Sequence, residues 1–226
     1  PDQVHGSEAK FQRIKWTRFS FPFLLISGAS VVQGRADIIM LGILDSSQSV
    51  GIYSAAARLT KLITFGLHAS NNIVAPLISE YHTEGRRTKL QKLLSTSSIS
   101  VLAYTVVVSI SLGLSGTYIL RLFGEKFVSG YSVLLVVMLG EIIHASMGPV
   151  GYLATMTGHQ WSASKAVGCG AVINIILNVV LIPSYGIIGA AIATMVSKSA
   201  WNFALLIFVK KRLKVSPTAF SIYRYL

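Results

Sequence analysis

The sequence predicts an all-α membrane protein in which six transmembrane helices form one bundle. Three observations support this fold class: an apolar composition, six apolar runs of membrane-spanning length, and basic residues concentrated in alternate connecting segments. Of the 226 residues, 52% are hydrophobic and only 12% are charged, and the mean hydropathy is +0.62. These values exceed the apolar share of ordinary soluble domains, so the chain is expected to lie in a lipid bilayer.

Each predicted helix is a run of about 20 or more mainly apolar residues, the length needed to cross a hydrocarbon core about 30 Å thick. Strands of a membrane barrel would instead be about ten residues long and would alternate in polarity. The six runs are residues 19–44, 50–78, 94–120, 131–157, 166–184 and 187–209. They divide the chain into a cytoplasmic N-terminal segment (1–18), a six-helix bundle (19–209) and a basic cytoplasmic tail (210–226).

The first two predicted helices carry charges within their apolar runs. Arg35 and Asp37 are two positions apart in the first helix, so they point to nearly opposite sides of it. The second helix carries a polar stripe at intervals of three or four residues, which is the spacing of one helix face. The stripe is expected to face a cavity or other helices, and its members are Ser54, Arg58, Lys61, Thr64, His68 and Asn72.

The remaining helices combine polar pairs with helix-breaking residues. The third run carries no charge until its C-terminal end, and the fourth contains Gly148 and Pro149, which can break or kink it. Three polar pairs share a helix face because their members are three or four residues apart. These pairs are Glu141 with His144, Asn174 with Asn178, and Thr194 with Lys198.

The charge of the connecting segments predicts the topology. Cytoplasmic loops hold most of the Lys and Arg of a membrane protein, and fourteen of the 20 lie on one predicted side, against Arg121 and Lys126 on the other. Both chain ends are therefore predicted to be cytoplasmic. The fourteen are Lys10, Arg13, Lys15, Arg18, Arg86, Arg87, Lys89, Lys92, Lys165, Lys210, Lys211, Arg212, Lys214 and Arg224.

Composition and spacing also disfavour several classes of function. The formal net charge of +12 does not indicate a nucleic-acid partner, because the basic residues lie between apolar runs instead of over a soluble face. The single Cys169 allows no disulfide framework and no cysteine metal site. The connecting segments are short, about fifteen residues at most, so an extramembrane catalytic domain has no place. Neither an enzyme nor a bound cofactor is expected.

Charged residues within the spans are expected to lie in one layer. Helical rise of about 1.5 Å per residue places them roughly 10–16 Å below the outer surface. Each charge there costs at least about 2.5 kcal/mol, so it needs a partner or water. The layer holds four cations and only two anions. The two excess positive charges require an aqueous cavity, bound anions or carboxylates from another chain. The layer comprises Arg35, Arg58, Lys61 and Lys198, with Asp37 and Glu141, and Asn174 at a similar depth.

Two structural interpretations stay open for the anions. Asp37 could form an ion pair with Arg35 or Arg58 that holds two helices together. Glu141 and His144 could be a packed polar pair without any role in transport. In either case the excess of positive charge in the layer would remain unexplained.

Four stretches resemble the C-terminal half of bacterial polysaccharide flippases of the O-antigen, repeat-unit type. These flippases belong to the multidrug/oligosaccharidyl-lipid/polysaccharide exporter superfamily. The most specific parts are the D-x-x-M-L-G and V-G-x-Y-x-x-A run and the N-x-x-L-N-x-x-L-I-P-x-x-G-x-x-G-A-A segment. The stretches are residues 35–59, 76–94, 122–160 and 174–197.

The resemblance implies a transporter that moves undecaprenyl-pyrophosphate-linked oligosaccharide to the outer leaflet of the bacterial plasma (inner) membrane. Family members have two six-helix bundles around a central, often cationic cavity. Six helices make one bundle, so an N-terminal six-helix half is the expected partner. The resemblance implies substrate contacts for Arg35, Arg58, Lys61, Lys198 and Asn174. It implies ion or proton coupling, by H⁺ or Na⁺, for Asp37, Glu141 and His144, with Glu141 and His144 preferred.

Other functions remain open at this stage. Within the same superfamily, the chain could belong to a drug/cation antiporter or a lipid II flippase, although excess positive charge disfavours an organic cation as cargo. A membrane glycosyltransferase, ligase or polymerase would need a catalytic cluster near a sizeable loop. A structural subunit or nonfunctional remnant would not need the charge layer.

Overall fold

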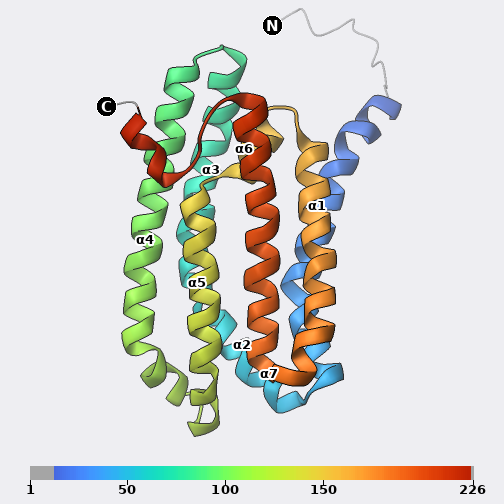
Figure 1. Cartoon of the computed structure of the whole chain (residues 1–226), viewed down its shortest axis with the longest axis vertical. Helices are drawn as coiled ribbons and strands as arrows, with labels where there is room; N and C mark the ends of the chain where they lie inside the picture. The colour runs from blue at the N-terminus through green and yellow to red at the C-terminus, as the bar shows by residue number, and fades with distance from the viewer. Residues whose placement is uncertain (1–12, 225–226) are drawn as a thin grey trace, which may run out of the picture.

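The computed structural model describes residues 13–224, and that range contains helices and short connections but no strand. The helices lie side by side along the long axis of one bundle (Figure 1). The predicted all-α fold class is confirmed. The elements are α1 (Arg13–Leu44), α2 (Ser47–Leu59), α3 (Lys61–Thr83), α4 (Arg87–Arg121), η1 (Glu125–Gly130), α5 (Tyr131–Met147), α6 (Val150–Met156), α7 (Gln160–Leu213) and η2 (Ala219–Arg224).

The outer surface of the bundle is apolar. Val107 and Leu114 of α4 and Ile43 of α1 are large hydrophobic side chains that stay exposed. Lipid tails solvate such side chains, whereas water would not. Among the described residues, four helices are long and apolar enough to cross a membrane: Phe19–Leu44, Arg87–Arg121, Glu125–Met147 and Gln160–Leu213. The chain is a membrane protein.

The long helix α7 is two antiparallel arms, which correspond to the fifth and sixth predicted spans. Gly186 has a φ of 54° and a ψ of −132°, a conformation outside the helical region that glycine tolerates best. Figure 1 shows the arms side by side, and Asn174 of the first arm donates a hydrogen bond to Thr194 of the second at 3.2 Å. The backbone of Leu181 fills the space where a side chain at Gly189 would lie.

The second predicted span, residues 50–78, is broken at Thr60. Its first part, α2, lies at the end of the bundle opposite the start of α1, and its second part, α3, runs back along the bundle (Figure 1). The Thr60 hydroxyl donates to the carbonyl of Ala57 at 2.9 Å. α3 is 23 residues long, but polar residues such as His68, Asn71 and Asn72 lower its hydropathy, and it is not among the four helices that are both long and apolar enough to span a membrane.

The fourth predicted span is broken between α5 and α6. Gly148 has a φ of +76°, and the backbone carbonyl of Pro217 occupies the place of its missing side chain. The chain after α7 is tied to α4 by Gln91, whose amide accepts from the Ser216 N–H at 2.9 Å and donates to the Ser216 carbonyl at 2.7 Å. The Ser98 hydroxyl donates to the carbonyl of Pro217 at 2.5 Å. We call residues 215–221 the strap.

Two apolar clusters hold the bundle together. One contains Ile78, Leu94, Leu153 and Leu205, and the other contains Leu41, Ile63, Leu134 and Ile182. α3, α5 and both arms of α7 each contribute to both clusters, from different points along their length. The clusters therefore lie toward opposite ends of the bundle. Of the polar layer predicted from the sequence, Glu141, Asn174 and Lys198 fall between these clusters along their helices, whereas Arg58 and Lys61 do not.

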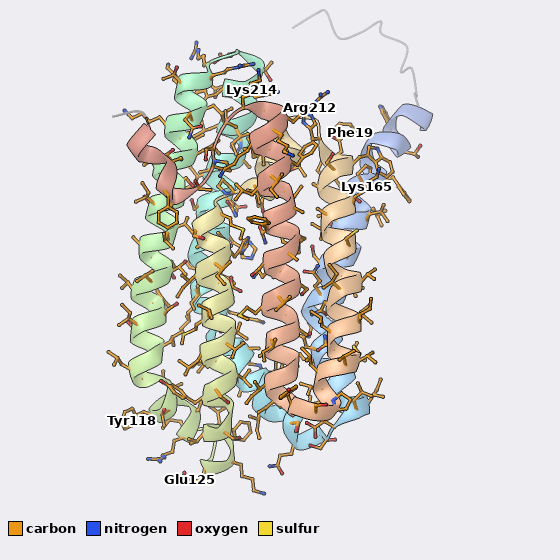
Figure 2. The ribbon with its side chains drawn as sticks, viewed as in Figure 1. Phe19, Tyr118, Glu125, Lys165, Arg212 and Lys214 are labelled. Atoms are coloured by element: carbon orange, nitrogen blue, oxygen red, sulfur yellow. The ribbon has the colours of Figure 1, made fainter. Side chains whose placement is uncertain are left out.

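The labelled basic residues and the labelled acidic residue lie at opposite ends of the bundle (Figure 2). Lys165, Arg212 and Lys214 lie at the end where α1 begins, whereas Glu125 lies at the other end (Figure 2). Ion pairs at the two ends are local: Arg86 with Glu84 at 3.0 Å, and Arg121 with Glu125 at 3.2 Å. Lys10 and the rest of residues 1–12 lie outside the described residues. The arrangement agrees with the predicted charge asymmetry but does not identify the cytoplasmic side.

Candidate functional site

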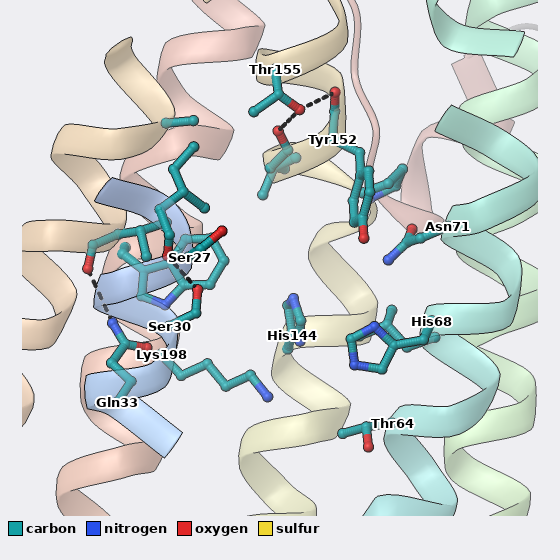
Figure 3. Close-up of a pocket in the computed structure, with 18 of the residues that line it drawn as sticks. Ser27, Ser30, Gln33, Thr64, His68, Asn71, His144, Tyr152, Thr155 and Lys198 are labelled. Carbon is teal, nitrogen blue, oxygen red and sulfur yellow. Dashed lines mark hydrogen bonds between the residues drawn. The ribbon is translucent and has the colours of Figure 1, made fainter. Parts of the chain in front are cut away.

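A cavity of about 700 Å³ lies among α1, α3, α5, α6 and both arms of α7 (Figure 3). α1 packs mainly on α7 and α3 packs mainly on α4, so the cavity occupies the space between α1 and α3. Carbon atoms form most of its wall. Three of the predicted site residues line it, namely Asn174, His144 and Lys198.

Lys198, Glu141 and His144 are brought together at one side of the cavity. The Lys198 ammonium lies 2.6 Å from one carboxylate oxygen of Glu141, and Nδ1 of His144 lies 3.7 Å from the other. Glu141 is buried, with 6% of its surface exposed. A buried charge without a partner would be strongly destabilising, so Lys198 and Glu141 compensate each other. The Glu141 carboxylate is therefore already occupied by a cation from its own chain.

Asp37 lies instead in a buried cage of neutral hydrogen-bond donors. Its carboxylate accepts hydrogen bonds from the Tyr53 hydroxyl at 2.5 Å, from the Asn178 amide at 2.8 Å and from the Asn174 amide at 3.2 Å. The Thr194 hydroxyl donates a fourth. Asp37 is 5% exposed, and it forms no ion pair with any of residues 13–224. The interpretation that pairs Asp37 with Arg35 or Arg58 is wrong.

The hairpin of α7 builds this cage. Asn174 and Asn178 are four residues apart on the first arm and therefore share a face. Thr194 comes opposite them because the chain reverses at Gly186. Asn178 keeps one acceptor free, since its side-chain oxygen is buried without a hydrogen-bond partner in the described part of the chain. The cage thus surrounds a carboxylate with two amide N–H donors, a hydroxyl and a phenol.

The other three predicted cations lie outside the cavity. Arg35, Arg58 and Lys61 are exposed, and none has an ion pair within residues 13–224. Arg35 directly follows Gly34, and Lys61 lies one helical turn before Thr64; both Gly34 and Thr64 line the cavity. Along α1 and α3, both cations therefore lie on the α2 side of the residues that line the cavity, and we call this side the edge of the cavity. The structure separates these cations from Lys198, which the sequence analysis placed in the same hollow.

Some residues of the site were not singled out from the sequence. Tyr53 is the tyrosine of the V-G-x-Y-x-x-A run, so the sequence motif already contained it. Nothing in the spacing of the motif indicated that it contacts Asp37. On α3 the predicted stripe is shifted: Thr64 and His68 line the cavity, but Asn71 does so in place of Asn72. α2 ends and α3 begins at the break at Thr60. The residues of the stripe before the break therefore do not share a helix face with those after it.

The curated proteins similar to this chain include two from Haloferax volcanii. "Probable low-salt glycan biosynthesis flippase Agl15" is 25% identical over 162 residues, which are 71% of this chain and 34% of that protein. "Probable flippase AglR" is 28% identical over 191 residues, which are 82% of this chain and 40% of that protein. The chain thus spans less than half the length of these relatives. No protein-family model matches the chain.

Comparison with solved structures gives whole-chain similarity in fold. "Lipid II flippase MurJ, inward closed conformation" has a TM-score of 0.71 at 20% identity, over 92% of this chain and 46% of that one. An outward-facing multidrug resistance MATE family transporter of the MOP superfamily has a TM-score of 0.74 at 19% identity, over 93% and 47%. The chain therefore has the fold of about half of a transporter of this superfamily.

Proposed function

We propose that this chain is half of a flippase that moves lipid-linked oligosaccharide, a saccharide unit on a polyprenyl pyrophosphate, to the outer leaflet. The observation that carries the proposal is the sequence similarity to two flippases over 71% and 82% of the chain, one of them named for glycan biosynthesis. The cavity between α1 and α3 supports it. Both relatives are archaeal, so a bacterial source and an O-antigen substrate stay predictions.

The exposed face of α1, α2 and α3 supports a second half as partner. On these helices Arg35, Arg58 and Lys61 are exposed, and so are the apolar side chains of Val31 and Phe65, each four residues from one of these cations on the same helix. Charges and apolar groups mixed in this way suit neither lipid nor water. A second six-helix half would cover the apolar part and enclose the charged part in an aqueous space.

The proposed mechanism is alternating access. Two halves rock about a binding site near the middle of the membrane, so that the site opens to one side at a time. Exposed cations attract the anionic pyrophosphate, and Arg35 and Arg58 offer planar forks that match two phosphate oxygens. The prenyl chain stays in lipid while the polar head crosses. No covalent bond is made or broken.

For ion coupling we propose Asp37 ahead of Glu141 and His144. A coupling ion needs a carboxylate whose charge is not already compensated. Lys198 compensates Glu141, whereas Asp37 faces only neutral groups. The hydroxyl oxygens of Tyr53 and Thr194 lie beside this carboxylate, and hard cations prefer oxygen ligands. A proton would bind the same carboxylate.

A second candidate, a multidrug transporter of the same superfamily, is favoured by the likeness in fold to the MATE structure. Its cargo would have to be compatible with the exposed Arg35, Arg58 and Lys61, which have no ion pair within the described residues, and this disfavours organic cations. A glycosyltransferase, ligase or polymerase has no counterpart among the relatives above.

The test is transport of labelled lipid-linked oligosaccharide by the complete transporter that contains this chain, reconstituted in liposomes. Appearance of the saccharide on the opposite leaflet is measured by its accessibility to a membrane-impermeant oxidant. We expect protein-dependent movement of the glycolipid and none of an organic cation such as ethidium. Movement of ethidium without movement of the glycolipid would favour the multidrug alternative.

A further inference from the structure

On one wall of the cavity, three polar side chains donate hydrogen bonds to the backbone, whereas the indole N–H of Trp201 has no partner among the described residues. On the side of α1 and α7, the Gln33 amide donates to the carbonyl of Val167 at 3.1 Å. The Ser30 hydroxyl donates to the carbonyl of Ile26 at 2.7 Å, and the Ser197 hydroxyl to that of Thr194 at 3.1 Å. These donors are turned onto the backbone, so this wall offers a ligand mainly carbon.

On the opposite wall, formed by α3 and α6, the Thr64 and Thr155 hydroxyls donate to backbone carbonyls, but three other polar side chains stay free. Asn71, His68 and Tyr152 line the cavity, and their side chains make no hydrogen bond with any residue that the structure describes. Asn71 is only 7% exposed. Its amide atoms are not fully enclosed and border the cavity, so they can form hydrogen bonds with the hydroxyl groups of a guest. Figure 3 shows His68, Asn71 and Tyr152 bordering the same space.

The inside and the outside of the cavity also differ in net charge. Inside the cavity the ammonium of Lys198 is held by Glu141 at 2.6 Å, which leaves no excess positive charge there. The uncompensated cations Arg35 and Lys61 stand just beyond the edge formed by Gly34 and Thr64. An anionic group is therefore favoured outside this edge, and an uncharged group is favoured inside.

We infer that this half splits its ligand between the two places: the cavity holds an uncharged saccharide, and Arg35 and Lys61 hold its phosphate. Asn71, His68 and Tyr152 bind saccharide hydroxyls, while the carbon-rich wall packs against the C–H faces of the rings. The volume of about 700 Å³ lies within the range of small-ligand pockets. This inference rests on the proposed function and assigns neutral sugars as the class of saccharide that the site accepts.

The test compares two probes on the purified complete transporter in lipid nanodiscs. One probe is a polyprenyl pyrophosphate carrying a neutral disaccharide, and the other is the same lipid without sugar. Asn71→Leu and Tyr152→Phe are expected to weaken binding of the first about tenfold, or about 1.4 kcal/mol, and to leave the second unchanged. Tyr118→Phe, on the exposed surface of α4, is the matched control and should change neither.

The two cations are tested with the same probes. Arg35→Gln and Lys61→Gln are expected to weaken both probes by the same factor. They should also reduce the salt dependence of binding, because salt screens exposed charges. The cavity variants should leave that salt dependence as it is in the wild type.

Several outcomes would overturn the inference. One is a Tyr152→Phe variant, which loses a single oxygen atom and should fold normally, that binds both probes like the wild type or loses both equally. Another is a wild type that binds the sugar-free lipid as tightly as the glycolipid. If the wild type binds neither probe, the proposed function fails, and this result is distinct from a failure of the division between cavity and rim.

Discussion

Two acidic residues at the centre of the bundle are stabilised in different ways. Glu141 has a cation from its own chain, Lys198, at 2.6 Å. Asp37 has only neutral donors, from Tyr53, Asn174, Asn178 and Thr194. An ion pair satisfies a carboxylate permanently, whereas a cage of neutral groups leaves its negative charge available to a mobile ion. This difference assigns the two residues different proposed roles.

Asp37→Asn tests the coupling role. The substitution keeps the size of the side chain but removes its charge, so we expect transport to lose its dependence on a Na⁺ or H⁺ gradient and to slow about tenfold or more. Initial rates of glycolipid movement in liposomes, with and without each gradient, provide the measurement. Asp45→Asn is the control, because Asp45 is exposed after α1. Unchanged gradient dependence in Asp37→Asn would exclude the role.

Glu141→Gln tests the ion pair. The change leaves the Lys198 ammonium without its counter-charge and should lower the free energy of unfolding by about 2 kcal/mol, less than for a fully buried pair because the Lys198 side chain is 22% exposed. Adding Lys198→Met should recover most of the loss. Thermal unfolding of the purified transporter and its variants gives the comparison. Equal stability of wild type and Glu141→Gln would mean that the pair contributes nothing.

At the scale of elements, the breaks in the helices shape the site. The break at Gly148 lets α6 lean over the cavity, which brings Tyr152 into its wall. The strap fixes this break from the other side, with the Pro217 carbonyl against Gly148 and Gln91 bound to Ser216. The hairpin at Gly186 likewise brings Thr194 to Asp37.

Gly148→Ala should therefore be costly. A side chain there would meet the Pro217 carbonyl and the Ser98 hydroxyl, and the positive φ adds backbone strain. Together we expect about 1–3 kcal/mol of destabilisation. Gly113→Ala is the matched control, because nothing lies within 4 Å of the added methyl group in the described structure and α4 is helical there. Thermal unfolding of both variants checks the prediction, which equal effects of the two substitutions would contradict.

At the scale of the whole molecule, the distribution of charge predicts the orientation in the membrane. The end that carries Lys165, Arg212 and Lys214 is proposed to face the cytoplasm, by the rule that cytoplasmic segments are rich in Lys and Arg. The opposite end, with Glu125 and Lys126, would then face outward. The same orientation puts Arg35 and Lys61 on the outward side of the cavity edge.

Cysteine labelling tests this orientation. Cys169 is the single native cysteine, so a Cys169→Ser background leaves only the introduced thiol. We expect a membrane-impermeant maleimide applied to intact cells to label Lys126→Cys, and to label Lys211→Cys only after permeabilisation. Both positions lie in exposed segments outside the bundle core. The reverse pattern would invert the proposed topology.

The sequence by itself determined the class of fold. Apolar runs of membrane length and basic residues concentrated between them are local properties, and the bilayer acts on each run separately. For the same reason the hairpin between the last two spans and the break at Gly148 were foreseeable from glycine and proline. The contact of Glu141 with His144 followed from helical spacing alone.

Only the tertiary structure decided which charges meet. Lys198 reaches Glu141, 57 positions away, and Asp37 meets Asn178, 141 positions away. Depth in the membrane put all these residues in one layer but left open which way each helix faces around its own axis. The packing of α1 on α7 and the break at Thr60 fix those rotations. As a result, Arg35 and Lys61 lie outside the cavity, although a prediction from depth alone had placed them in it.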